Sequence, residues 1–171
     1  DIHLKALSFN IMLVDSSAYN IQFLGPKPIF IDHLSFRPYK EGQLWQGHKQ
    51  FIEQFICPLL ITAYCKFPFQ NSYRGSFDGV PLQQLAKMLP ISATLNWRIL
   101  GHIFIPAWLE TKKTNKVSRP MDKPKHLTRK HFRGMLEDLK SWVLALKSPQ
   151  NYGFWVDYET SNSYTNNDED R

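Results

Sequence analysis

The feature that most constrains the fold is a long run of helically spaced apolar residues between Trp45 and Tyr64. Apolar side chains recur there at intervals of three and four residues, which is the spacing of one buried helix face. Pro58 lies inside the run. Because proline lacks an N–H and clashes with the preceding turn, this helix is predicted to be kinked or split.

Three further segments show helical spacing. They are Pro81–Leu89, Leu95–Leu109 and a run from an N-cap at Thr128 through Lys147. Pro106 is expected to end or bend the second of these. At the start of the chain, the apolar run Leu4–Leu13 is predicted to close a helix that begins before Asp1.

A small β-hairpin is predicted near the N-terminus. Short apolar runs at Ile21–Leu24 and Ile29–Ile31 flank Gly25-Pro26, a pair typical of turns. The predicted class is therefore mainly α with a small β-hairpin (α+β). We expect a helical region over 1–110 with the hairpin at about 15–36, a linker over 111–127, a helix over 128–148 and a tail over 149–171.

The positive charge of the chain is concentrated in one segment. The net charge is +6, and residues 111–133 contain nine basic residues and one acidic residue. An exposed basic loop is expected there, and it could act as an interaction module for an acidic partner. Its candidate contact residues are Lys112, Lys113, Lys116, Arg119, Lys123 and Lys125. The loop has no aromatic residues for base stacking, so nucleic-acid binding is not favoured.

The small number of cysteines and the lack of a sufficiently apolar segment indicate a cytoplasmic protein. Cys57 and Cys65 cannot form a disulfide scaffold and are predicted to be reduced thiols. The longest apolar run, 91–109, contains Asn96, Arg98 and His102, which makes it too polar to span a membrane.

Three polar residues around the hairpin have a spacing that suggests chemistry. Asp15 precedes Asn20 by five residues, and Asp32 follows the second strand. In a phosphotransferase catalytic lobe, residues in this order serve as catalytic base and as two Mg²⁺ ligands. This pattern assigns catalysis to Asp15 and a possible Mg²⁺ site to Asn20 and Asp32, and it makes the first region resemble a kinase large lobe.

Other positions depart from that pattern. Leu13 stands where kinases usually have histidine, His33-Leu34 follows Asp32, and the eight glycines form no nucleotide loop. A degenerate kinase-like domain that binds metal or nucleotide is therefore one alternative, and local turn capping by the three residues is the other. Tyr73 and Arg74 form a further candidate ligand site, because Arg74 could clamp a carboxylate or phosphate.

Several longer phrases resemble a family. The phrases are DSSAYNIQF, PIFIDHLSFRPY, LWQGHKQFIEQFICPLL and YRGSFDGVPL, with a weaker echo in GFWVDYETSNSY. They are similar to the N-terminal region of bacterial S-adenosylmethionine-dependent methyltransferases of the nodulation host-specificity type. The shared positions include Asp15, Asn20, Asp32, Ser35, Phe36, Trp45, Gln50, Phe51, Tyr73, Arg74 and Gly75.

The resemblance implies that this chain is a non-catalytic region. In that family the methyl donor binds a later Rossmann-like domain with a glycine-rich turn, and no such turn occurs in these 171 residues. The chain is thus predicted to be a substrate-positioning or scaffolding region, with S-adenosylmethionine bound only elsewhere in the parent protein. The implied partners are the parent's own C-terminal methyltransferase domain and an unidentified small-molecule acceptor.

Overall fold

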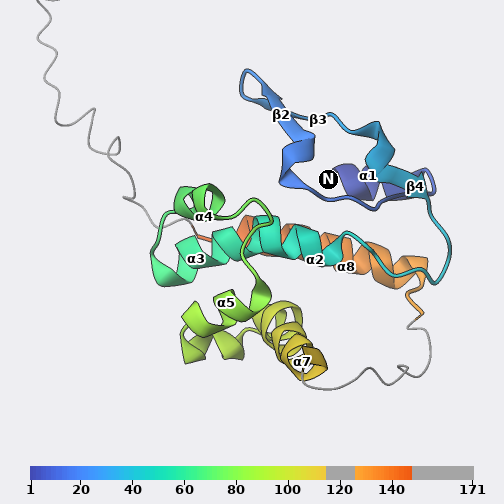
Figure 1. The fold of residues 1–171 in the computed structure, drawn as a ribbon. Coiled ribbons are helices and arrows are strands. Elements are labelled where there is room, and N and C mark those ends of the chain that lie inside the picture. The colour runs from blue at the N-terminus through green and yellow to red at the C-terminus, as the bar shows by residue number, and fades with distance from the viewer. Residues whose placement is uncertain (115–125, 148–171) are drawn as a thin grey trace, which may run out of the picture.

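The computed structural model describes residues 1–114 and 126–147 (Figure 1). The α-helices are α1 (Ile2–Ser8), α2 (His48–Phe51), α3 (Cys57–Cys65), α4 (Phe69–Gly75), α5 (Leu82–Met88), α6 (Trp97–Ile99), α7 (Ile105–Thr114) and α8 (Arg129–Ala145). The strands are β1 (Ile11–Leu13), β2 (Ile21–Leu24), β3 (Lys27–Phe30) and β4 (Phe36–Pro38). The shorter turns of helix are η1 (Ala18–Asn20), η2 (His33–Ser35), η3 (Ile52–Ile56), η4 (Ile91–Leu95) and η5 (Leu100–Phe104).

The molecule is mainly α-helical with two small antiparallel sheets, which confirms the predicted class. The sheets and α1 lie on one side of the α2–α3 helix, and α5 and α7 lie on the other (Figure 1). The β2–β3 hairpin stands away from the helices. Within the described residues no helix is both long and apolar enough to cross a membrane.

The predicted distortion at Pro58 is present as a π turn. Helix α2 continues through η3 into α3, so one helix runs from His48 to Cys65. In the π turn Cys57 N–H bonds the carbonyl of Ile52, five residues earlier. Pro58 has no N–H to continue this register, so the carbonyl of Glu53 is open to another donor. Val80 N–H donates a hydrogen bond to this carbonyl at 2.9 Å.

A second helix has the same construction. Helices α6 and α7 are joined by the π turn η5, and Pro106 again follows the π turn by two residues. The prediction that this helix ends near Leu109 was wrong, because α7 continues to Thr114. The first residues of the basic segment are therefore helical rather than looped. Residues 115–125, which hold Lys116, Arg119, Lys123 and Lys125, lie outside the described residues.

The N-terminal helix differs from its prediction. Helix α1 ends at Ser8, and Asn10 takes a left-handed backbone conformation with φ 61°. This reversal sends Ile11–Leu13 into a strand, and β1 pairs antiparallel with β4. Strand β3 begins at Lys27, two residues before the predicted start, and pairs with β2.

One hydrophobic core joins these elements. It extends from Leu7 in α1 through Ile52 and Ile56 to Ile103 and Trp142. Helix α8 begins at the predicted N-cap, where the Thr128 hydroxyl accepts a hydrogen bond from His131 N–H. Residues 148–171, which include the predicted tail, lie outside the described residues.

Candidate functional site

Asn20 and Asp32 meet at the base of the hairpin, as their spacing predicts. Asn20 Nδ2 donates to Ser35 Oγ at 3.0 Å, and Ser35 Oγ donates to Asp32 Oδ2 at 2.5 Å. The backbone carbonyl of Asn20 also accepts from Ile31 N–H at 2.9 Å. The side chains of Asn20 and Asp32 therefore lie two hydrogen bonds apart, bridged by the buried hydroxyl of Ser35.

The carboxylate of Asp32 is already occupied by donors. Its Oδ1 accepts from Leu34 N–H at 2.8 Å and caps η2. The hydroxyl of Ser35 and then Leu34 N–H lower the pKa of Asp32, because both stabilise the ionised form. The carboxylate is thus negative and fixed, and it closes the base of the hairpin.

Asp15 takes part in a different contact. Its Oδ1 accepts a hydrogen bond from Ser17 N–H at 3.0 Å, the geometry of a local Asx turn. The structure therefore links Asn20 with Asp32 and uses Asp15 to shape the preceding loop. Over residues 1–114 and 126–147, no group of three or more His, Cys, Asp or Glu residues could hold a metal ion. A catalytic role for Asp15 and a Mg²⁺ role for Asn20 and Asp32 remain predictions.

The loop after Asp15 is held by two glutamines one helical turn apart. Gln50 Oε1 accepts from Ser16 N–H and Gln54 Oε1 accepts from Ala18 N–H, each at 2.7 Å. Gln54 is buried. Helix α2 and the π turn thus position the loop before β2, and Glu53 of the π turn also holds the segment that enters α5.

The second candidate ligand pair falls on α4. Arg74 is exposed in the last turn of that helix. The side chain of Tyr73 lies outside the described residues, so the structure does not place the predicted pair around a ligand.

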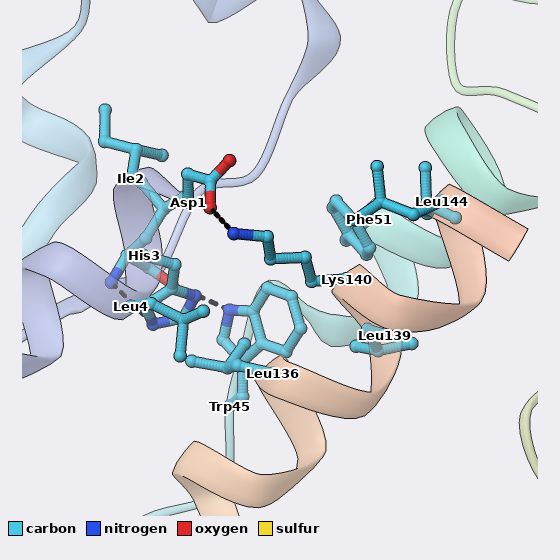
Figure 2. A pocket seen from close by; sticks show the side chains of 12 residues that line it. Asp1, Ile2, His3, Leu4, Trp45, Phe51, Leu136, Leu139, Lys140 and Leu144 are labelled. Carbon is cyan, nitrogen blue, oxygen red and sulfur yellow. Dashed lines mark hydrogen bonds and ion pairs between the residues drawn. The ribbon is translucent and has the colours of Figure 1, made fainter.

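A mostly apolar cavity of about 280 Å³ opens between α1 and α8 (Figure 2). Trp45, Leu136 and Leu139 contribute to its walls, and Lys140 reaches Asp1 across its rim. His3 also lines this cavity, and its Nε2 accepts from Leu13 N–H at 3.2 Å. Burial lowers the pKa of His3 to about 4, so the ring is neutral at pH 7.

A half-buried histidine pair lies in the helical part of the molecule. His48 Nε2 and His102 Nδ1 are 3.2 Å apart, and the His102 ring stacks on Trp142. Burial lowers the pKa of both histidines, that of His48 to about 4. No local pattern indicates this pair, because 54 residues separate its members and their helices meet only in the folded chain.

Ser35 and Gln54 are the other residues that sequence reasoning overlooked as site components. Ser35 belongs to the phrase that carries the family resemblance, and Gln54 is a polar residue within an apolar run. A polar residue on a buried face indicates a specific hydrogen bond, since burial without a partner is costly.

The two cysteines match their predicted state. Cys57 is buried and Cys65 is partly buried, and both are free thiols. Burial raises the pKa of each thiol, so neither is an activated nucleophile.

Comparison with curated proteins finds one relevant similarity. The chain is 39% identical over 167 residues to Nodulation protein NoeA of Rhizobium meliloti (strain 1021). The match covers 96% of this chain and 35% of the relative, so the chain spans about a third of the length of the protein it matches. No family model matches the chain. No solved structure matches it either.

Proposed function

We propose that this chain is a substrate-positioning or scaffolding region of an S-adenosylmethionine-dependent methyltransferase of the nodulation type. The similarity to a nodulation protein three times as long supports a role beside further domains. The absence of a glycine-rich donor turn from the sequence argues that the methyl donor binds outside this chain. The observation that carries the scaffolding role is a group of exposed apolar side chains on the helical side of the molecule, here called the apolar surface.

This apolar surface lies on η4 and on the outer side of the α6–α7 helix. The inner side of that helix buries Ile99, Ile103 and Ala107 at intervals of four residues. The outer side exposes large apolar side chains instead. The surface comprises Ile91, Leu95, Trp97, Leu100, Ile105, Trp108 and Leu109.

The exposure of these side chains is unusually high. Leu95 is 88% exposed, Trp97 is 65% exposed and Trp108 is 56% exposed. Contiguous apolar patches with aromatic residues are typical of interaction surfaces, since water contact with them is unfavourable. In this proposal the surface packs against another domain of the parent protein.

The β2–β3 hairpin offers a second apolar contact. Phe23 and Leu24 at its end are 69% and 72% exposed, and the hairpin projects from the body (Figure 1). Both of its outer strand edges are unpaired within the described residues. A projecting apolar ribbon of this kind can insert between partners or add a strand to a neighbouring sheet.

The docking role can be tested in trans. A polypeptide covering the part of the rhizobial relative that this chain does not match would be titrated with this chain by calorimetry. Binding is expected, and Leu95→Ser combined with Trp108→Ser should weaken it at least tenfold. Leu144→Ser is the matched control, because Leu144 is equally apolar and 76% exposed but lies on α8.

Two results would overturn the proposal. One is the absence of binding by the unmodified chain, and the other is equal weakening by Leu144→Ser. The non-catalytic assignment has its own test, in which the chain is titrated with S-adenosylmethionine. Micromolar or tighter binding of the donor to this chain alone would contradict it.

A further inference from the structure

A second cavity, of about 560 Å³, lies where three helices meet. Its walls come from the end of α3, the start of α6 and the last turn of α8. The polar side chains that line it are Tyr64, Lys66, Asn96, Arg98, Trp142 and Lys147. It shares none of its lining residues with the apolar cavity beside α1.

The charged groups of this cavity are all cationic. Lys66, Arg98 and Lys147 line it, and no Asp or Glu occurs among the described residues of its wall. Neither Lys66 nor Lys147 forms an ion pair within the described part of the chain. Two exposed lysines of the cavity lining therefore have no carboxylate partner among the described residues.

Arg98 is held in place by a partner outside the wall. Its Nε and Nη2 grip the carboxylate of Asp138 at 2.6 to 3.2 Å, and Nη2 also donates to Ser141 Oγ at 3.0 Å. No described residue accepts a hydrogen bond from Nη1. The guanidinium is thus pre-oriented, and one amino group is left to donate elsewhere.

Helix dipoles reduce this positive field only in part. The C-termini of α3 and α8 each place about −0.5 charge near the cavity, and the N-terminus of the α6–α7 helix places about +0.5 there. The carboxylate of Asp138 offsets Arg98. The two lysines carry more positive charge than the partial negative charges of the two helix C-termini can balance, so the site stays positive.

The rest of the cavity wall is suited to an apolar organic group. Tyr64 provides aromatic surface, and Ala63 and Leu146 provide aliphatic surface, whereas Trp142 is only 2% exposed. The cavity therefore combines hydrogen-bond donors and cations with an apolar wall, as expected for an anion attached to an organic group.

The backbone at Lys66 also distinguishes this site. Lys66 caps α3 in the left-handed conformation with φ 57°, which glycine adopts far more readily than lysine. The residue that ends α3 in this strained conformation also belongs to the cavity lining.

We propose that this cavity, bounded by Lys66, Arg98 and Lys147, binds the phosphate group of a small organic phosphate. The two ammonium groups and Nη1 of Arg98 contact the phosphate oxygens, and Tyr64 contacts the organic part. The proposal does not depend on the docking role of the apolar surface.

The probes for this site are pyrophosphate and citrate, titrated into the full chain by calorimetry at low ionic strength. Pyrophosphate is expected to bind with one site per chain, and Lys66→Gln combined with Lys147→Gln should weaken it at least tenfold. The matched control is Lys130→Gln, which removes a charge from the other end of α8. This control should leave binding within twofold, and circular dichroism would verify that each variant is folded.

Three outcomes would overturn the proposal. They are no pyrophosphate binding by the unmodified chain, equal weakening by Lys130→Gln, and citrate binding as tight as that of pyrophosphate. The first would remove the site, the second would reduce it to general charge attraction, and the third would refute phosphate as the recognised group. Lys66→Gly adds an independent check. It relieves the backbone strain yet should weaken binding, so a loss of affinity there cannot be attributed to misfolding.

Discussion

At the scale of single residues, Gly79 shows why one position without a side chain matters. Its φ is +88°, and a Cβ there would lie 2.5 Å from the carbonyl oxygen of Glu53 and 2.8 Å from Gln54 N. Both neighbours are backbone atoms of the π turn and cannot move aside easily. Gly79 thus lets the chain come close enough for Val80 N–H to donate a hydrogen bond to the carbonyl of Glu53.

We therefore expect Gly79→Ala to destabilise the fold. The loss should be about 2 kcal/mol or more, because a left-handed conformation and a backbone clash add together. Urea unfolding would measure it. Gly134→Ala is the control, since nothing lies within 4 Å of a Cβ at Gly134 and alanine favours the interior of α8. It should stabilise by about 0.5 to 1 kcal/mol, and a similar loss in both variants would contradict the argument.

The half-buried histidines His48 and His102 make stability depend on pH. Burial, followed by the neighbouring His102, lowers the pKa of His48 from 6.5 to about 4. Burial also lowers the pKa of His102, although Asp138 partly offsets this effect and Arg98 adds to it. A lowered folded-state pKa means that the unfolded chain binds protons first, so the stability present above pH 6.5 is lost as the pH falls toward 4.

The slope of this loss is measurable. Each histidine that takes up its proton only on unfolding contributes about 1.4 kcal/mol per pH unit within that window. His48→Gln should therefore reduce the slope of the unfolding free energy by about that amount between pH 6 and 4.5. Urea titrations at several pH values would determine it, and an unchanged slope in the variant would contradict the assignment.

At the scale of elements, the distorted helix from His48 to Cys65 organises the N-terminal half. Gln50 and Gln54 accept hydrogen bonds from the loop before β2, and the backbone carbonyl of Glu53 accepts one from the segment before α5. A regular helix could not serve all these partners, because its carbonyls would be paired internally. The proline two residues after the π turn is therefore a cause of the tertiary arrangement.

The two glutamine contacts can be separated by hydrogen exchange. Gln50→Ala should speed exchange at the Ser16 amide, and Gln54→Ala should speed it at the Ala18 amide, since each variant removes the acceptor of that N–H. Loss of either hydrogen bond should lower the free energy of unfolding by about 1 to 3 kcal/mol, because an N–H in this loop is left unpaired. Each variant serves as the control for the other, and identical exchange patterns would show that the loop opens as one unit instead.

At the scale of the whole molecule, the core is continuous from α1 to α8. Phe132 on α8 contacts the rings of His3, Tyr39 and Trp45, which belong to three different N-terminal segments. Trp45 in turn donates to the carbonyl of Leu13 at 2.7 Å and ties β1 to the same cluster. Residues at opposite ends of the described chain thus share one core.

This continuity predicts a single unfolding transition. Far-ultraviolet circular dichroism and tryptophan fluorescence should give coincident curves in urea. Phe132→Leu should shift both midpoints together, with a loss of about 1 kcal/mol. Leu144→Ala, an exposed change on the same helix, should shift neither by a comparable amount. Separate transitions for the two probes would show that the N-terminal segments fold independently of α8.

The sequence by itself determined the helical class, the main helices, the hairpin and the cap of α8. These features depend on local spacing, proline and capping chemistry, which act over a few residues. It also placed Asn20 and Asp32 together, because a hairpin brings its two ends to one place. The strand after α1 was not predicted, since a three-residue strand has too little pattern of its own and depends on β4 for pairing.

Only the tertiary structure decided the rest. It brought His48 to His102, Phe132 to Trp45, and Lys66 to Lys147, pairs that no local pattern connects. It also placed the Asp15 carboxylate in a local turn, where Oδ1 accepts a hydrogen bond from Ser17 N–H. The physical reason is that burial, electrostatic field and cavity shape are properties of surfaces that meet across the chain, and periodicity along the chain carries no information about which surfaces those are.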